Sequence, residues 1–231
     1  MAKPRVSRRS EALADHDLAL RPDESMLLRP QDLLDYERRF WGRGRLVAGV
    51  DEAGRGPLAG PVIAAAVVLP QGVHIEGADD SKKLSHNTRE ALYNKITSSA
   101  LAFGVGAASA REIDQINILR ATTVAMQRAL EKLGMDECAV AVDGLPVKGL
   151  GLEHDAIVGG DGLVHSIGCA SILAKVSRDR LMVRLSERYP AYGWERNKGY
   201  GTSEHRKAIE AFGLTSHHRL TFAGLQYHLE L

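Results

Sequence analysis

Two adjacent acidic residues, Asp51 and Glu52, are followed at once by a loop rich in glycine and proline. The stretch reads GVDEAGRGPLAGP and contains one arginine, Arg55. Neighbouring carboxylates repel each other, and glycines weaken any strand that they interrupt. Such a stretch is either an acidic turn or a site at which a cation neutralises the acids while bare backbone approaches a ligand.

Two further acids follow hydrophobic runs that are typical of buried strands, Asp143 after CAVAV and Asp161 after AIVGG. A sheet brings strand ends together, so Asp51, Glu52, Asp143 and Asp161 are expected to converge on one place. Without a counter-charge, at least one of these acids would have to take up a proton. A divalent cation removes the conflict, and an all-oxygen ligand set suits Mg²⁺ or Mn²⁺. The alternative, that each acid only caps a helix or a turn, stays open at this point.

The glycines of GRGPLAG do not fit a nucleotide-binding loop. Such a loop opens a helix whose first amides meet a phosphate, whereas here Pro57 removes an amide and PVIAAAVVL continues as a strand. The absence of a following GK[ST] sequence also excludes a P-loop. What remains is a surface of backbone amides beside the acids, able to contact a sugar or phosphate, or simply a tight turn between two strands.

The charges of the chain are distributed unevenly. The 231 residues are 44% hydrophobic and 26% charged, which is ordinary for a soluble globular protein of one or two domains, and the net charge is +1. Residues 175–219 contain ten Lys or Arg against five acids, a local net charge of +5. This favours a polyanionic partner only modestly, because a charged helix face would have a similar composition.

Cysteine usage and hydropathy indicate a cytoplasmic protein without a membrane segment. Cys138 and Cys169 lack CxxC spacing and have small or apolar neighbours, so both are expected to be reduced core residues. The longest apolar run is VIAAAVVL, far shorter than the roughly 18 residues that a membrane span needs. The N-terminal segment mixes both charge signs and has no hydrophobic core of a signal peptide.

The hydrophobic pattern predicts an α/β fold, a sheet covered on both faces with a small helical extension at the C-terminus. Predicted strands cover residues 46–51, 62–69, 101–108, 138–144 and 156–162. Predicted helices cover 29–41, a segment from Ser85, a segment after a capping box of Ser109 and Glu112, 118–134, 170–189 and part of SEHRKAIEAFG. Residues 1–28 are expected to form a disordered tail, and the residues after the last helix a loose polar end.

Six blocks of sequence in a fixed order make the chain recognisable. They are GVDEAGRGPLAGPVIAAAVVL, DDSKKLS, INILRATTVAMQRAL, AVDG, GGDG with SIGCASILAKVSRDR, and NKGYGTSEHRKAI. Together they resemble ribonuclease HII, the type 2 ribonuclease H family, over residues 46–218. The resemblance implies a ribonuclease H-like mixed five-stranded sheet flanked by helices. It divides the chain into a catalytic domain at 29–189 and a C-terminal helical extension at 190–231 that completes the substrate site.

The resemblance also assigns roles to single residues. It implies that the catalytic, metal-binding carboxylates are those of Asp51, Glu52, Asp143 and Asp161, with Asp161 matching least closely. It implies that the backbone of Gly54, Arg55 and Gly56 reads the 2′-hydroxyl of a ribonucleotide. Tyr200 would pack on the sugar of the neighbouring deoxynucleotide; taken alone, this residue would be better explained as a core tyrosine.

Basic residues around the acids are candidates for contacts with phosphates, because carboxylates alone would repel a nucleic acid. Lys82 and Lys175 are the preferred candidates, since both lie inside matching blocks. The remaining candidates are Lys83, Arg178, His205 and Arg206.

The expected activity is that of a metal-dependent endoribonuclease, with two Mn²⁺ or Mg²⁺ ions during catalysis. The family resemblance implies cleavage of RNA in RNA/DNA hybrids and on the 5′ side of a ribonucleotide embedded in duplex DNA, leaving a 3′-hydroxyl and a 5′-phosphate. A histidine-based route to a cyclic phosphate is not favoured, because His217 and His218 lie in the predicted polar end without a partner motif.

Two alternatives are another metal-dependent nuclease of this fold, which would cut all-DNA substrates, and a non-catalytic nucleic-acid-binding module, which should lack an acid. The protein is expected to be a monomer.

Overall fold

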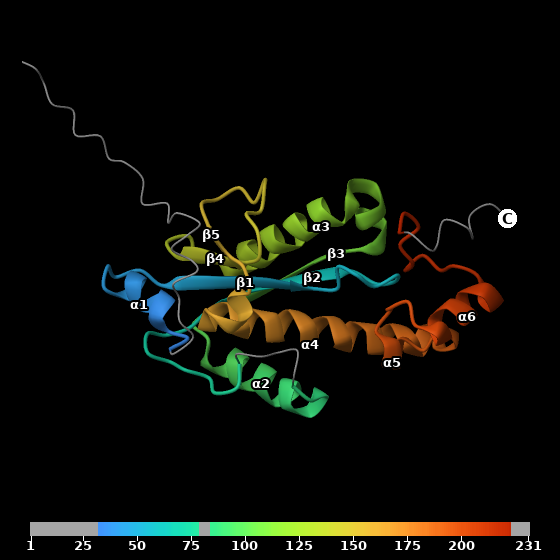
Figure 1. The fold of residues 1–231 in the computed structure, drawn as a ribbon, viewed down its shortest axis with the longest axis horizontal. Helices are drawn as coiled ribbons and strands as arrows, with labels where there is room; N and C mark the ends of the chain where they lie inside the picture. The colour runs from blue at the N-terminus through green and yellow to red at the C-terminus, as the bar shows by residue number, and fades with distance from the viewer. Residues whose placement is uncertain (1–31, 79–83, 223–231) are drawn as a thin grey trace, which may run out of the picture.

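The computed structural model describes residues 32–78 and 84–222 (Figure 1). The five strands are β1 (Val47–Ala53), β2 (Val62–Val68), β3 (Ala102–Ala108), β4 (Ala139–Asp143) and β5 (Asp155–Ile157). The α-helices are α1 (Asp35–Trp41), α2 (His86–Ser99), α3 (Ala110–Leu133), α4 (His165–Arg188), α5 (Trp194–Asn197) and α6 (Ser203–Phe212). The predicted tail at 1–28, together with Lys82 and Lys83, lies outside the described residues.

The strands form one mixed sheet in the order β3-β2-β1-β4-β5. The pairs β1–β2 and β2–β3 are antiparallel, whereas β1–β4 and β4–β5 are parallel. Helix α3 packs on one face of the sheet, and α4 with α2 packs on the other (Figure 1). The predicted α/β class and the mixed five-stranded sheet are therefore confirmed.

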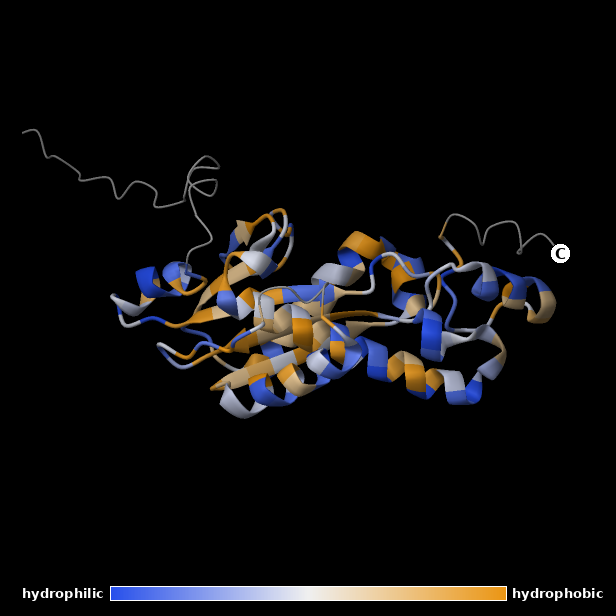
Figure 2. Cartoon of the chain, turned by 60° about the horizontal axis from the view of Figure 1, so that its bottom comes forward, coloured by the Kyte–Doolittle hydropathy of each residue, from blue (hydrophilic) through white to orange (hydrophobic). Residues whose placement is uncertain are grey.

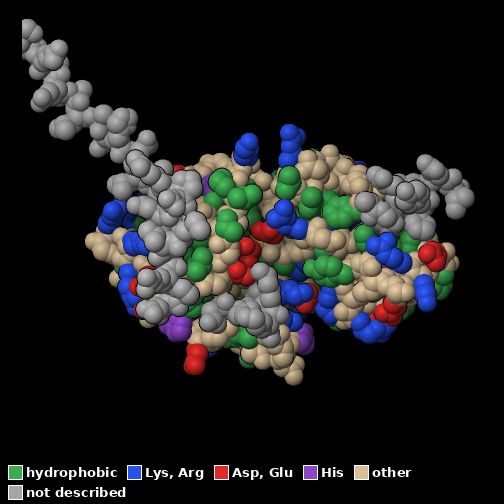
Figure 3. All heavy atoms as spheres, in the orientation of Figure 1, with side chains coloured by type: hydrophobic (Ala, Val, Ile, Leu, Met, Phe, Trp, Pro, Cys, Tyr) green, Lys and Arg blue, Asp and Glu red, His purple; other side chains and the backbone are tan. Residues whose placement is uncertain are grey.

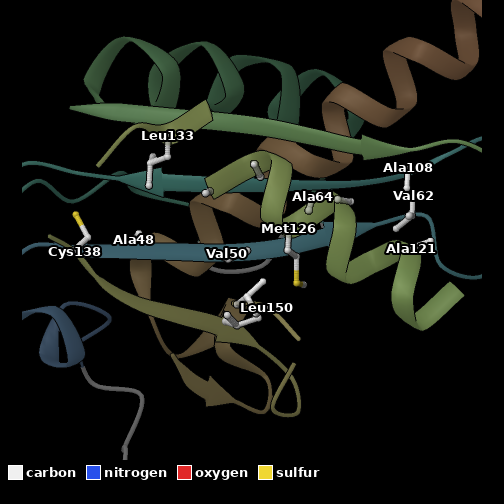
Figure 4. Close-up of a cluster of buried hydrophobic side chains, with 14 of the residues drawn as sticks. Ala48, Val50, Val62, Ala64, Ala108, Ala121, Met126, Leu133, Cys138 and Leu150 are labelled. Carbon is white, nitrogen blue, oxygen red and sulfur yellow. The ribbon is translucent and has the colours of Figure 1, made fainter. Parts of the chain in front are cut away.

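The core on the α3 face is built from small side chains (Figure 4). Ala48, Val50, Ala64 and Met126 belong to one cluster of buried residues. Glycine lets the helix approach the sheet closely, because a Cβ added at Gly106 would lie 2.1 Å from a backbone oxygen of α3. Hydrophobic residues follow the strands, while hydrophilic and hydrophobic residues alternate around the helices (Figure 2). The sheet is therefore buried between two closely packed helical layers.

Local capping signals placed two helix starts correctly. Ser85 accepts a hydrogen bond from the amide of Thr88 at the start of α2. Ser109 and Glu112 form the expected reciprocal capping box at the start of α3. Within α3, Asn117 has a non-helical backbone (φ 66°, ψ 165°) and its side chain accepts from the amides of the next turn. The segments predicted as two helices are thus two helical pieces joined at a kink.

Three predicted boundaries were wrong. Strand β1 continues to Ala53, two residues beyond the predicted end at Asp51, so Glu52 also lies within the strand. Strand β5 ends at Ile157, and Asp161 lies in a separate 3-10 turn, Gly160–Gly162. Helix α4 begins at His165, before the predicted start at residue 170, because close packing against Gly49 lets its first turn dock on β1.

The residues after α6 are not a loose end up to Phe222. His218 and Arg219 are buried with 2% and 0% exposure, and the backbone of Arg219 donates to the carbonyl oxygen of Leu58. The composition of this segment is polar, but its polar groups are satisfied inside the protein, a pattern that hydropathy cannot distinguish from solvation. In the described part of the chain, no helix is long and apolar enough to cross a membrane.

Candidate active site

Three of the four predicted acids lie at the same edge of the sheet. Strands β1 and β4 are parallel neighbours in which Val50 pairs with Val142, so Asp51 and Asp143 follow on adjacent strands. Successive side chains of a strand alternate between faces. Asp51 shares the face of Gly49, which packs against α4. The sheet therefore brings together acids that lie far apart in the sequence.

The acids line a cleft of about 430 Å³. Its walls come from β1 and the loop after it, β4, α2, α4 and the loop before α6: Asp51, Glu52, Ala53, Gly54, Arg89, Asp143, Ser171, Lys175, Arg178 and Tyr200. In the view of Figure 3, acidic side chains lie near the middle of the face, with basic and hydrophobic side chains around them. The cleft thus holds acids, a lysine and an aromatic ring within one concave surface.

Burial and mutual repulsion make the acids hold their protons more tightly than usual. Burial raises the pKa of Asp51 well above its ordinary value, and the charges of Glu52 and Asp143 add to the effect. Burial also raises the pKa of Glu52, against the opposing influence of Arg55. A carboxylate cluster of this kind is stabilised by a cation, which favours the ionised forms.

The donor chemistry of the cleft fits a divalent cation, although the side chains hold other partners. Glu52 pairs with Arg55 at 3.2 Å, and Asp143 accepts a hydrogen bond from the amide of Gly160 at 2.7 Å. Within residues 32–78 and 84–222, no group of three or more His, Cys, Asp or Glu side chains is placed to hold a metal ion as it stands. The carboxylates therefore have the donor type that suits a divalent cation, and in this structure Glu52 and Asp143 are held by protein partners.

Asp161 is not brought into the cleft with the other three acids. It lies in the 3-10 turn whose Gly160 amide supports Asp143, and it is not a residue that lines the cavity. The expected convergence of four acids is thus found for Asp51, Glu52 and Asp143. The prediction of a strand ending in Asp161 was wrong because the GG sequence before it forms a turn, with Gly159 at φ 71°.

The loop after β1, residues 54–61, is called the glycine loop below. Gly54 has φ 94°, a conformation that favours glycine, and a Cβ there would lie 2.0 Å from Nε of Arg178. A Cβ at Gly56 would instead meet only Cε1 of Tyr200, at 3.8 Å. Glycine therefore occupies the two positions for different reasons. At residue 54 the backbone conformation and the contact with Arg178 require it, and at residue 56 it leaves a bare surface next to Tyr200.

Two buried arginines hold the glycine loop, and neither role was predicted. Arg178 is 1% exposed and donates to the carbonyl oxygens of Ala59, Pro61 and Lys198 at 3.0 to 3.1 Å. Arg219 donates to the carbonyl oxygens of three other residues of the loop. The interpretation of Arg178 as a phosphate contact was wrong, since its guanidinium group is already bonded inside the protein.

His205 was also wrongly interpreted as a phosphate contact. It is fully buried, and its ring nitrogens lie 2.9 Å from the carbonyl oxygen of Tyr200 and 3.0 Å from the indole nitrogen of Trp194. His205 thus supports the backbone of Tyr200, whose own side chain is 45% exposed. Arg206 remains on the surface, where its Nε donates to the carbonyl oxygen of Gly201.

Lys175 lies at the cleft as predicted, and two other residues there were missed. Lys175 forms an ion pair with Asp179 at 2.8 Å and is partly exposed. Ser171 lies one helical turn before it on α4 and hydrogen-bonds Asp51. Arg89 reaches the cleft from α2. The four-residue spacing of Ser171 and Lys175 could have indicated a shared face, whereas nothing in the sequence around Arg89 points to the site.

A mixed sheet of this order, with carboxylates on its adjacent strands β1 and β4, defines the ribonuclease H-like class of nucleases. A family model described as Ribonuclease HII matches residues 48–225. A ribonuclease HII of Burkholderia mallei is 49% identical over 201 residues, covering 87% of this chain and 92% of the relative. The chain belongs to the ribonuclease HII family, and it is a metal-dependent endoribonuclease of RNA/DNA hybrids.

Solved structures show the same fold. The crystal structure of ribonuclease H2 from Pyrococcus horikoshii OT3 is 28% identical, with a TM-score of 0.68, and the match covers 80% of this chain and 97% of that one. Bst-RNase HIII in complex with Mn²⁺ is 18% identical, with a TM-score of 0.65, and the match covers 80% of this chain and 70% of that one. The second likeness bears on the fold alone.

Proposed function

We propose that the enzyme cuts on the 5′ side of a ribonucleotide embedded in duplex DNA, as well as within RNA/DNA hybrids, and leaves a 3′-hydroxyl and a 5′-phosphate. The observation that carries this proposal is the single cleft shared by Asp51, Glu52 and Asp143, the start of the glycine loop and Tyr200. A phosphodiester-cleaving centre beside a surface of bare backbone is suited to a substrate that differs from its neighbours by one hydroxyl group.

The carboxylates of Asp51, Glu52 and Asp143 would hold Mg²⁺ or Mn²⁺, with Asp161 as a more remote fourth acid. Glu52 would exchange Arg55 for the cation, and the Gly160 amide would keep Asp143 in place. The bound cations would supply an activated water and stabilise the leaving oxygen in an in-line displacement at phosphorus. The all-oxygen donor set of these carboxylates supports this choice of metal class.

The remaining residues of the cleft would bind and orient the nucleic acid. The amides of the Gly54-Arg55-Gly56 segment would contact the 2′-hydroxyl, and Tyr200 would pack on the next sugar. Lys175, and Lys82 from outside the described residues, would contact phosphates. Recognition through shape and the 2′-hydroxyl in the minor groove needs no reading of bases. His217 and His218 lie away from the cleft lining, which supports a route without a histidine base.

A cleavage assay with two matched duplexes tests the proposal. One DNA duplex carries a single ribonucleotide and the other has the same sequence without it, and both are incubated with Mg²⁺ or Mn²⁺. We expect one cut on the 5′ side of the ribonucleotide, none in the all-DNA duplex, and ends that can be rejoined by a DNA ligase. Asp51→Asn should lower the rate by at least about 100-fold, because it removes a cation ligand.

The folding of the variant serves as a control. Asp51→Asn removes a charge whose burial is unfavourable, so the metal-free variant should unfold at a temperature no lower than the wild type. Cleavage of the all-DNA duplex, a cyclic phosphate end, or an undiminished rate in a folded Asp51→Asn would each refute the proposed function.

A further inference from the structure

Arg219 is a fully buried arginine that binds only backbone oxygens of the glycine loop. Its exposure is 0%, and it donates to the carbonyl oxygens of Gly54 at 2.6 Å, Arg55 at 2.9 Å and Gly60 at 2.9 Å. It is separated from Gly54 by 165 positions in the sequence. The guanidinium fork therefore ties the start and the end of this loop to the last described segment of the chain.

These contacts fix the direction of two peptide groups. In a planar trans peptide the carbonyl and the amide of the next residue point in opposite directions. Because Arg219 holds the carbonyl oxygens of Gly54 and Arg55, the amides of Arg55 and Gly56 must point away from it. Within the described part of the chain, no hydrogen bond engages either amide. Two donors are thus presented together on the side of the loop opposite to Arg219.

Arg219 places a charged side chain in the interior, where a neutral side chain would be less costly to bury. No carboxylate of the described residues lies within ion-pair distance of Arg219, and burial together with the nearby charge of Arg178 lowers its pKa to about 9. The ring of Phe222 lies 4.9 Å from its Cζ. A guanidinium group is the side chain that can donate to three carbonyl oxygens at once in a rigid plane, which a lysine cannot do.

We infer that Arg219 is a positioning residue for ribose recognition, acting through the peptide planes of Gly54 and Arg55. It presents the Arg55 and Gly56 amides as paired donors to the oxygen of a 2′-hydroxyl. The inference rests on the proposed function, because it names the residue that orients the proposed contact. It predicts that loss of Arg219 lowers the preference for a ribose and leaves general binding to DNA unchanged.

The competing explanation is that Arg219 only stabilises the fold. The two explanations predict different values for one ratio of kinetic constants. An enzyme with a partly unfolded population loses apparent kcat, while KM for the cleaved duplex and Ki for a competing duplex stay constant. A glycine loop whose amides no longer point towards the ribose raises KM for the duplex with one ribonucleotide. It leaves Ki for the all-DNA duplex unchanged. The ratio Ki(all-DNA)/KM(one ribonucleotide) therefore separates positioning from stability.

The test is to measure this ratio for the full chain as wild type, Arg219→Met, Arg219→Lys and Ile209→Ala. We expect Arg219→Met to lower the ratio by about tenfold, since hydrogen bonds to a correctly aimed donor pair are lost. Arg219→Lys should lower it by a smaller factor, because an ammonium group holds fewer of the three carbonyl oxygens. Ile209→Ala removes a buried side chain of the same C-terminal cluster, and it should lower the unfolding temperature without changing the ratio.

Each outcome is decisive. Failure of the wild type to cut the duplex with one ribonucleotide would refute the proposed function itself, whereas a wild-type ratio of one would refute recognition of the ribose during binding. A wild-type preference that persists in Arg219→Met would refute the role of Arg219 alone. If Arg219→Met does not fold, a wild-type ratio in folded Arg219→Lys overturns the inference, and a lowered ratio supports it.

Discussion

At the scale of single residues, the glycine loop shows that neighbouring glycines can be constrained by different forces. Gly54 combines a positive φ of 94° with contact to Arg178, so any side chain there would strain the backbone and collide with a buried arginine. Gly56 has neither constraint. Its bare surface is next to Tyr200 at the cleft, where a ligand would lie. One glycine serves the fold, and the other leaves an open surface next to Tyr200.

Substitution by alanine should affect stability at Gly54 and catalysis at Gly56. Gly54→Ala should destabilise the protein by about 1 to 3 kcal/mol, because the backbone conformation is unfavourable for alanine. Gly56→Ala should leave the unfolding temperature unchanged but lower kcat/KM on a duplex with one ribonucleotide, since a methyl group would cover the surface near Tyr200. Thermal unfolding and steady-state kinetics of both variants check this. A stable, fully active Gly56→Ala would contradict it.

At the scale of elements, the C-terminal segment depends on a pair of uncharged histidines. Nε2 of His205 and Nε2 of His218 lie 3.1 Å apart in the interior, and the amide of Thr215 donates to Nδ1 of His218. Burial lowers the pKa of His218 to about 4, and the adjacent His205 adds to the effect. A second proton on either ring would face another buried donor, so the segment holding Arg219 requires the neutral form.

Acid should therefore destabilise the protein through His218. The folded state binds this proton less tightly than the unfolded chain, whose histidine has a pKa near 6.5, so the free energy of unfolding is retained above that value and falls as pH drops towards 4. The expected loss from His218 is roughly 2 to 3 kcal/mol by pH 4. Urea unfolding at several pH values should show a shallower slope for His218→Gln than for wild type.

His86→Gln removes an exposed histidine of α2 and provides the matched control. An equal acid dependence in His218→Gln and wild type would show that this buried pair does not govern the acid sensitivity.

At the scale of the whole molecule, the basic character of residues 175–219 is smaller than the sequence count suggests. Arg180 pairs with Glu90, and Arg196 pairs with Glu195 and Glu204. Arg178 and Arg219 are buried against backbone oxygens. Lys175 is also paired, with Asp179 at 2.8 Å, but unlike Arg180 and Arg196 it lines the cleft.

Salt dependence should separate these two kinds of cation. Lys175→Gln should reduce the slope of log Kd against log salt concentration for DNA duplexes by about one, because one phosphate contact is lost. Arg180→Gln, which removes a paired cation that does not line the cleft, should change the slope much less. Fluorescence anisotropy over a range of salt concentrations measures both slopes. Equal changes in the two variants would contradict the assignment of Lys175.

The sequence predicted what depends on local pattern and missed what depends on distant contacts. Alternating and helical periodicity located the five strands and the main helices, and capping residues located the starts of α2 and α3. The positions of Asp51, Glu52 and Asp143 followed from the meeting of strand ends. Arg219 could not be found in this way, because a polar residue that binds carbonyl oxygens far away in the sequence resembles one that faces water.

The grip of Arg219 on the glycine loop has an evolutionary consequence. The carboxylates that would take part in phosphodiester cleavage come from β1 and β4. Arg219, which would orient the amides that contact the ribose, comes from the C-terminal part of the chain. Substitutions in the C-terminal part of the chain would then change the preference for a ribose and leave the catalytic carboxylates in place. Relatives with different substrate preferences would then differ mainly in the C-terminal residues that contact the glycine loop. The carboxylates of the sheet would stay the same.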